Sequence, residues 1–332
     1  MRLITFGEIM LRLSPPGREL LLQRPQLDIW VAGAEANVAT ALVMLDHDVR
    51  FVSRVPDSDL GRAAVARLRG AGVDTRGIRY GGDRLGLYFV IAGAGLRATE
   101  VLYDREHSAF AEAQADEWDW PALLQGADRL HLSGITPALS EEAARAAVDA
   151  ARAANAAGML VSFDGNYRQK LWERRGVDPR PILRGLVAEA DLLFGNHRDL
   201  ALLLAEDFGG EGEPRLREAA LAAFDAFPRL RTIASTARRV EHADLHRLAA
   251  RVETRSEVAQ TEEIVLAGIV DRIGAGDAFA AGVLHALDGG IQAAARSGLA
   301  LAALKHSLPG DAALFRQADI DAYLAGGLDV RR

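Results

Sequence analysis

Short apolar runs that are typical of buried β-strands alternate with helical segments over most of this chain. Such runs occur at residues 129–133, 159–164, 192–194 and 231–233, and an alanine-rich helix is predicted from Ser140 to Ala157. Strands that are separated by helices pair in parallel, because each crossover returns the chain to the same end of the sheet. The alternation therefore predicts an α/β fold with a mainly parallel central sheet and helices on both of its faces.

One segment interrupts this alternation. Residues 85–92 and 99–104 are both β-prone, and Gly93-Ala94-Gly95 between them suits a tight turn. The resulting hairpin predicts a small β-sheet lid, built from about residues 10–32 and 84–108, on a single domain that spans residues 1–332. An exposed edge of such a lid favours pairing with a second copy of the chain, so a homo-oligomer through the lid is expected.

The composition excludes several classes of protein. The net charge of −7 provides no basic face for nucleic acid, and no apolar stretch is long enough to span a membrane. The chain has no cysteine, which excludes disulfides, thiolate catalysis and cysteine-ligated metals. We therefore expect a cytoplasmic protein that binds neither nucleic acid nor membrane.

Lysine is almost absent. Of 39 basic residues only Lys170 and Lys305 are lysines, which leaves 37 arginines. The chain contains no Gly-Lys-Ser/Thr sequence and hence no P-loop. A site for phosphate or carboxylate must therefore use arginine side chains and backbone amides.

Residues 270–282 carry the clearest indication of function, with the sequence Val-Asp-Arg-Ile-Gly-Ala-Gly-Asp-Ala-Phe-Ala-Ala-Gly. The glycines allow successive N–H groups to point into one concavity, and the start of the apolar helix that follows adds partial positive charge there. Such a site binds a polyanion, with Asp277 beside it as a proton acceptor. A base next to an anion site is what phosphoryl transfer to a hydroxyl requires. The short pattern Gly-x-Gly-Asp alone is more often an ordinary turn with a helix cap, so the function is inferred from the longer string.

This string closely resembles the C-terminal signature of the ribokinase-like (PfkB) sugar kinases, Asp-x-x-Gly-Ala-Gly-Asp-x-Phe. The resemblance implies a ribokinase-like three-layer fold in which the lid covers the substrate. It also implies that Asp277 is the catalytic base and that the amides of Gly274, Ala275 and Gly276 form the anion hole. ATP and Mg²⁺ are the cofactors that this family uses.

Four further segments, at residues 31–39, 85–88 with 103–105, 131–140 and 164–172, are similar to the 2-keto-3-deoxygluconate kinases of the same superfamily. The resemblance implies that Arg105 and Arg168 hold the carboxylate of a sugar acid. It also implies a set of substrate-binding residues around them: Gly33, Asn37, Tyr88, Tyr103, Ile135, Asn166 and Asp311.

Elementary chemistry favours an acid sugar as well. Tyr103 and Arg105 are two residues apart on a predicted strand, so their side chains face the same side. A guanidinium group donates two parallel hydrogen bonds to a carboxylate, which a neutral sugar cannot accept in that form. The alternatives are that these arginines are solvated surface residues and that Tyr88 and Tyr103 only pack in the lid.

The chain departs from the family at the nucleotide end. The usual Asn-x-x-Glu, which organises Mg²⁺ through water, is Asn196-His197-Arg198-Asp199 here, and Asn196 as a plain helix cap is the alternative. Residues 232–239 lack the glycines of the usual Gly-x-x-Gly turn, so the ATP loop must have another shape. Ser235, Thr236 and Arg238 are then the candidates for phosphate contacts, together with Asn196, Gly274 and Gly276.

Taken together, these features predict an ATP-dependent kinase that converts 2-keto-3-deoxygluconate to 2-keto-3-deoxy-6-phosphogluconate. Within the same family, a ketodeoxygalactonate kinase or a fructokinase is the alternative. From a different class, a non-catalytic sugar-binding sensor on the same fold is the alternative.

Overall fold

The structure, a computed structural model, describes residues 1–326. Its strands are β1 (Arg2–Phe6), β2 (Met10–Ser14), β3 (Asp28–Ala32), β4 (Asp48–Val55), β5 (Asp74–Tyr80), β6 (Gly86–Ile91), β7 (Glu100–Asp104), β8 (Arg129–Ser133), β9 (Leu160–Asp164), β10 (Leu192–Phe194), β11 (Thr232–His242), β12 (Leu245–Glu253), β13 (Val258–Gln260) and β14 (Ile264–Ala267). Its α-helices are α1 (Ala34–Met44), α2 (Asp59–Gly70), α3 (Trp120–Leu123), α4 (Thr136–Leu139), α5 (Glu141–Ala156), α6 (Gln169–Arg175), α7 (Arg180–Ala188), α8 (His197–Leu204), α9 (Gly212–Ala226), α10 (Ala275–Ala286), α11 (Ile291–Lys305) and α12 (Gln317–Leu324). None of the helices in this part of the chain is long and apolar enough to cross a membrane.

The large sheet confirms the predicted α/β class. Its strands run in the order β13-β12-β11-β10-β9-β8-β1-β4-β5, and the pairs from β11 to β5 are all parallel. Because β1 lies between β8 and β4, the chain builds the sheet outward in both directions from the first strand. In an open parallel sheet, ligands bind beyond the carboxyl ends of the strands near such a change of direction.

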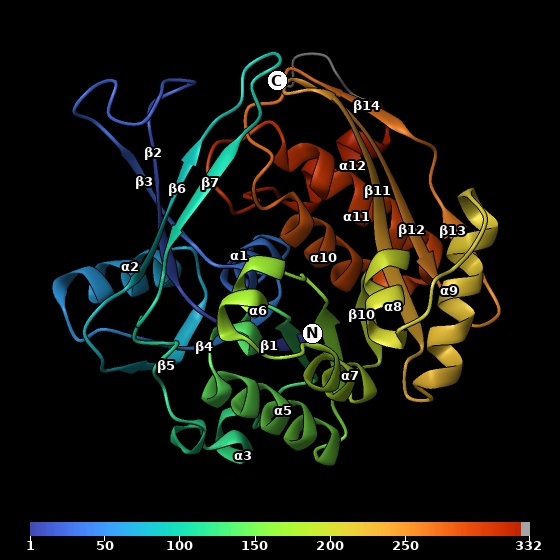
Figure 1. Ribbon diagram of the computed structural model, residues 1–332, viewed down its shortest axis with the longest axis horizontal. Coiled ribbons are helices and arrows are strands. Elements are labelled where there is room, and N and C mark those ends of the chain that lie inside the picture. The colour runs from blue at the N-terminus through green and yellow to red at the C-terminus, as the bar shows by residue number, and fades with distance from the viewer. Residues whose placement is uncertain (327–332) are drawn as a thin grey trace.

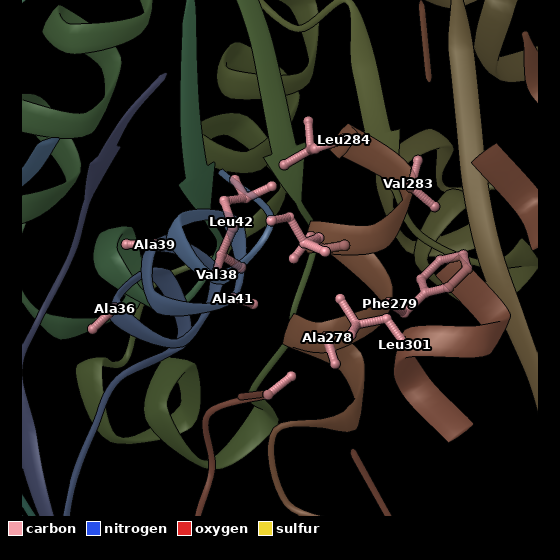
Figure 2. Close-up of a cluster of buried hydrophobic side chains, with 14 of the residues drawn as sticks. Ala36, Val38, Ala39, Ala41, Leu42, Ala278, Phe279, Val283, Leu284 and Leu301 are labelled. Atoms are coloured by element: carbon pink, nitrogen blue, oxygen red, sulfur yellow. The ribbon is translucent and has the colours of Figure 1, made fainter. Parts of the chain in front are cut away.

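Apolar side chains alternate between the two faces of this sheet. Leu3 belongs to a buried cluster with α1, α2, α10 and α11, whereas Ile4 belongs to a second cluster with α5, α7, α8 and α9. Figure 2 shows side chains of α1, among them Val38 and Leu42, gathered with those of α10 in the first cluster. This packing brings the beginnings of α1 and α10 together, and both beginnings line the site described below.

A separate sheet of four strands, in the order β3-β2-β6-β7, stands beside the large one at the upper left of Figure 1. The predicted hairpin is confirmed, since β6 and β7 pair antiparallel. All four strands lie in the two segments assigned to the lid, and β2 pairs with β3 antiparallel and with β6 in parallel. We infer that residues 1–326 form one domain with this sheet as its lid, while residues 327–332 of the predicted domain lie outside the described residues.

One local feature differs from the expectations, and the strand partner of a second segment was not predicted. The segment 232–239 forms no loop, because β11 continues through it to His242 and pairs antiparallel with β12. The β-prone residues before the glycine turn form β14, which pairs antiparallel with β12 outside the parallel part of the sheet. An isolated apolar run does not reveal its partner strand, and this limits prediction at both places.

The packing of α10 against α11 depends on a glycine and predicts a stability effect. A Cβ on Gly282 would lie 2.6 Å from the Ser297 carbonyl oxygen and 2.8 Å from the Gly298 Cα. We expect Gly282→Ala to lower the free energy of unfolding by about 1–3 kcal/mol, because backbone must move to admit the methyl group. The measurement is a denaturant titration.

Gly185→Ala is the matched control, because Gly185 lies in α7 and a Cβ there would have no atom within 4 Å. This variant should be unchanged or more stable by up to about 1 kcal/mol. Equal stability of the two variants would contradict the close contact of α10 with α11.

Candidate active site

A cavity of about 680 Å³ lies between the small sheet and the carboxyl ends of the central strands. Its lining includes most of the residues that the sequence nominated for binding and catalysis: Gly33, Asn37, Tyr88, Tyr103, Arg105, Ile135, Asn166, Arg168, Asn196, Asp199, Ser235, Thr236, Arg238, Gly274, Gly276, Asp277 and Asp311. Ala275 lines an adjoining hollow of about 750 Å³ instead. Segments that are far apart in the sequence thus converge at the place where the topology predicts a ligand.

The start of α10 forms one end of this cavity. Gly274 is the cap residue, with φ at +79°, and a Cβ there would lie 1.8 Å from the Asp311 carbonyl oxygen. Only glycine fits this position, so the residue sets where the helix begins. The first amide groups of a helix have no acceptor within it, and together with the helix dipole they make this end a site for an anion.

The Asp277 carboxyl lies in the first turn of α10 and accepts a hydrogen bond of 2.7 Å from the Asn37 amide of α1. Burial raises the pKa of Asp277 to about 8, and the Asn37 hydrogen bond lowers it only in part. The negative charges of Asp164, Asp311 and Glu35 raise this pKa further. The sequence predicted Asp277 as a proton acceptor, and its surroundings in the fold favour the protonated form of the carboxyl group.

The two arginines of the predicted carboxylate clamp have different surroundings. Arg105 is buried, and its guanidinium group forms an ion pair with Glu8, with the Nε–Oε2 distance at 2.9 Å. The Arg168 side chain, at the start of α6, is exposed and has no ion-pair partner among residues 1–326. Arg105 thus already has a partner in Glu8, 97 positions away in the sequence, while it also lines the cavity, and its contact with a substrate carboxylate stays a prediction.

Other predicted sugar contacts line the same end of the cavity. The rings of Tyr88 and Tyr103 stack across β6 and β7 with centroids 5.7 Å apart, and Arg105 lies 5.8 Å from the Tyr103 ring. The Tyr88 hydroxyl donates to Asp311, and Arg12 binds the other oxygen of that carboxylate at 2.8 Å. Both oxygens of Asp311 thus have partners inside the protein, which weakens its case as a sugar ligand.

The proposed metal residues form a helix cap. The Asn196 side chain accepts from the Arg198 amide at 2.8 Å, and the Asp199 side chain accepts from the Asn196 amide at 2.8 Å. These two bonds satisfy the start of α8, as the alternative from the sequence expects. Both residues nevertheless line the cavity beside Asp164, whose pKa burial raises to about 7, with a further contribution from the Asp199 charge.

Ser235, Thr236 and Arg238 lie on β11, where the cavity meets the adjoining hollow. Arg272, from the turn before α10, lines the cavity as well. Burial lowers the pKa of Arg238, and the charge of Arg272 lowers it further, so the two cations repel each other. Neither has an ion-pair partner among residues 1–326, which leaves this part of the cavity suited to a polyanion.

Comparison with known proteins decides the family. Residues 2–233 match the model of the pfkB family of carbohydrate kinases. The chain is 36% identical, over 98% of its length and 97% of the relative's, to 2-dehydro-3-deoxygalactonokinase of Haloferax volcanii. The chain belongs to the pfkB carbohydrate kinase family. The family match ends before the glycine turn, so residues 271–279 are independent support for the same conclusion.

Solved structures of this kinase family include close matches. The crystal structure of 2-dehydro-3-deoxygluconokinase from Thermotoga maritima is 35% identical, with a TM-score of 0.93 over 98% of both chains. By sequence, the chain is also 28% identical, over 93% of its length and 90% of the relative's, to a 2-dehydro-3-deoxygluconokinase of Bacillus subtilis. This pfkB kinase is thus a phosphotransferase with the ribokinase-like fold, as its sequence predicts.

Several residues at the site escaped sequence reasoning. Four of them lie in segments that the sequence brought out, and a fifth lies just before the lid segment, but none differed from its neighbours: Arg12, Asp164, Asp271 and Arg272, and then Glu8. Glu35 is buried and accepts from Ser133 at 2.6 Å, and burial raises its pKa. These residues have in common that each is charged and lies close to apolar residues in the sequence. Such a pattern indicates that the side chain has a buried partner, but it does not identify the partner.

The raised pKa of Asp277 predicts the pH dependence of catalysis. A base acts when unprotonated, so kcat/KM should rise with pH through about 8 and level off above it. Asn37→Leu removes a hydrogen bond that favours the ionised carboxylate. The midpoint of the kcat/KM profile should therefore move to higher pH in this variant. The measurement is kcat/KM against pH for both proteins.

Thr40→Val is the control for this pH profile, because Thr40 lies one turn further along α1 and its hydroxyl donates to the Ala36 carbonyl. Its midpoint should equal that of the unmodified kinase. A midpoint near 4 in the unmodified kinase would contradict the raised pKa.

Proposed function

We propose that this kinase transfers the γ-phosphoryl group of ATP to the primary hydroxyl of 2-keto-3-deoxygluconate, giving 2-keto-3-deoxy-6-phosphogluconate, in the cytoplasm. The guanidinium group of Arg168, which lines the same cavity as the anion site of α10 and has no ion-pair partner among residues 1–326, carries this proposal. The names of the relatives from Thermotoga maritima and Bacillus subtilis support the same sugar acid.

The chemistry follows from the positions of the groups. The sugar hydroxyl oxygen attacks the γ-phosphorus, the bond to the β-phosphate oxygen breaks, and the hydroxyl proton passes to Asp277. Amides at the start of α10 stabilise the charge on the transferred group, and Arg238 and Arg272 neutralise the phosphates. ADP leaves with the electron pair of the broken bond.

Mg²⁺ fits the acidic side chains beside this path. Asp164 and Asp199 line the cavity and would hold the ion, directly or through water, with Asn196 next to them. Among residues 1–326, no cluster of three or more His, Asp or Glu side chains could hold a metal by itself, so phosphate and water would complete its ligands. Bound there, the ion would neutralise phosphate charge.

The galacto epimer is the second candidate substrate, because the Haloferax volcanii relative is named 2-dehydro-3-deoxygalactonokinase. The experiment is ATP consumption over both ketodeoxy acids, fructose and ribose. We expect the highest kcat/KM on 2-keto-3-deoxygluconate, and a preference for its epimer would favour the second candidate. No consumption with any of the four sugars would favour the sugar-binding sensor.

Arg168→Leu tests the carboxylate contact. The loss of a charge-assisted pair should cost about 2–4 kcal/mol, a fall of roughly 30- to 1,000-fold in kcat/KM on 2-keto-3-deoxygluconate. Activity on fructose and the KM for ATP should change little, because neither involves the sugar carboxylate. The measurement is parallel kinetics on both sugars.

Arg174→Leu is the matched control on the same helix. Arg174 is exposed and pairs with Glu106 at 2.6 Å, a contact of little energetic weight. This variant should keep both activities. Equal losses of Arg168→Leu on both sugars, or a raised KM for ATP, would assign Arg168 to the phosphates instead.

We also propose that two copies pair through their lids. Apolar side chains on one face of the small sheet remain exposed, with Ile29 at 62% and Leu102 at 42%. Burying such side chains between two copies is favourable. Light scattering should therefore give the mass of a dimer, and Ile29→Glu with Leu102→Glu should give a monomer. A monomeric unmodified kinase would contradict this pairing.

A further inference from the structure

A buried cation from the lid binds the turn that precedes the anion site. Arg12 lies on β2, and its side chain is 4% exposed. Its Nη1 lies 2.6 Å from Asp271 Oδ2 and 2.8 Å from Asp311 Oδ1. Its Nε donates to Ser14 at 3.0 Å, and its guanidinium carbon lies 5.0 Å from the Trp30 ring on β3. The arginine is therefore held in the lid while it contacts two loops of the main domain.

Asp271 connects this contact to the anion site. Its Oδ1 accepts from the Ile273 amide at 3.0 Å, which shapes the turn one residue before Gly274. Its Oδ2 accepts from the Gly310 amide at 3.1 Å. The position of the Asp271 carboxylate thus determines how the backbone enters the start of α10.

The loop at 308–311 is tied to both sides. A Cβ on Gly310 would lie 2.6 Å from the Trp30 ring, and one on Gly274 would lie 1.8 Å from the Asp311 carbonyl oxygen. Lys305, fully buried in α11, donates to the carbonyls of Leu308 at 3.1 Å and Asp271 at 3.4 Å. The loop is therefore packed between the lid and the anion site. Lys305 holds it there through its hydrogen bonds to the two carbonyl groups.

We propose that Arg12 is a positioning residue that couples the lid to the anion site, by holding Asp271 where the amides at the start of α10 face the cavity. The inference rests on the proposed sugar kinase activity. Substrate bound against β6 and β7 then reinforces, through Arg12, the site that stabilises the transferred phosphoryl group. Arg12 itself makes no contact with the reacting atoms. Its role is to align the amides that bind the transferred group.

The competing interpretation is a buried structural ion triad. Removing only the arginine leaves two buried carboxylates without their partner, which destabilises any fold. The test therefore compares Arg12→Met with the double variant Arg12→Met, Asp311→Asn. The double variant removes one positive and one negative charge and keeps an acceptor for the Tyr88 hydroxyl. Arg84→Met is the control, because Arg84 is an exposed lid arginine paired with Asp104 at 2.8 Å.

Kinetics at saturating sugar and ATP give the first result. We expect kcat to fall on the order of 10- to 100-fold in Arg12→Met, the effect of a misplacement of about 1 Å. The double variant should regain thermal stability but keep the low kcat. Arg84→Met should have the thermal stability and the kcat of the unmodified kinase. A double variant that regains stability and kcat together would overturn the proposal, as would an unchanged kcat in Arg12→Met.

Hydrogen exchange of the full chain gives the second result. Adding 2-keto-3-deoxygluconate to the unmodified kinase should slow exchange in β6 and also in residues 271–276. In the double variant the sugar should still protect β6 but no longer residues 271–276. Protection of both segments in the double variant would overturn the coupling. An unmodified kinase with no activity on any sugar acid would instead refute the proposed function.

Discussion

A backbone contact between Gly274 and Asp311 determines the geometry of the whole site. The Asp311 carbonyl oxygen occupies the space in which any other residue at 274 would carry its Cβ. The helix α10 can therefore begin only where these two loops meet, and Asp277 follows in its first turn. Apolar packing against α1 and the close approach of α11 at Gly282 then hold the helix in place.

The electrostatics of the cavity depend on the same arrangement. Four acidic side chains line it, and burial raises the pKa of each: Asp164, Asp199, Asp277 and Asp311. Three guanidinium groups that have no ion-pair partner among residues 1–326, those of Arg168, Arg238 and Arg272, line it as well. A protein that served stability alone would pair these charges with one another. The three arginines therefore stay available to an anionic substrate and a nucleotide, and Asp164 to a cation.

The arginines around the cavity differ in what surrounds them. Arg12 and Arg105 are buried and paired with carboxylates, so they fix the position of the protein's own loops. Arg168 is exposed and has no ion-pair partner within the described part of the chain. Since a guanidinium group is always charged, its partner decides whether it positions the protein or binds a ligand.

The amino-acid sequence by itself determined the fold class, the lid hairpin and the anion turn at Gly274, because each depends on a local pattern of periodicity or glycine. It also brought out Asp277 and Arg168 as candidates. Only the tertiary structure decided the pairing of Arg105 with Glu8 and the continuous pairing of β11 with β12 through residues 232–239. The raised pKa of Asp277 was likewise decided only by the tertiary structure. The physical reason is that charge pairing, burial and strand partnership arise between segments distant in the chain, and a local pattern contains no information on which segments will meet.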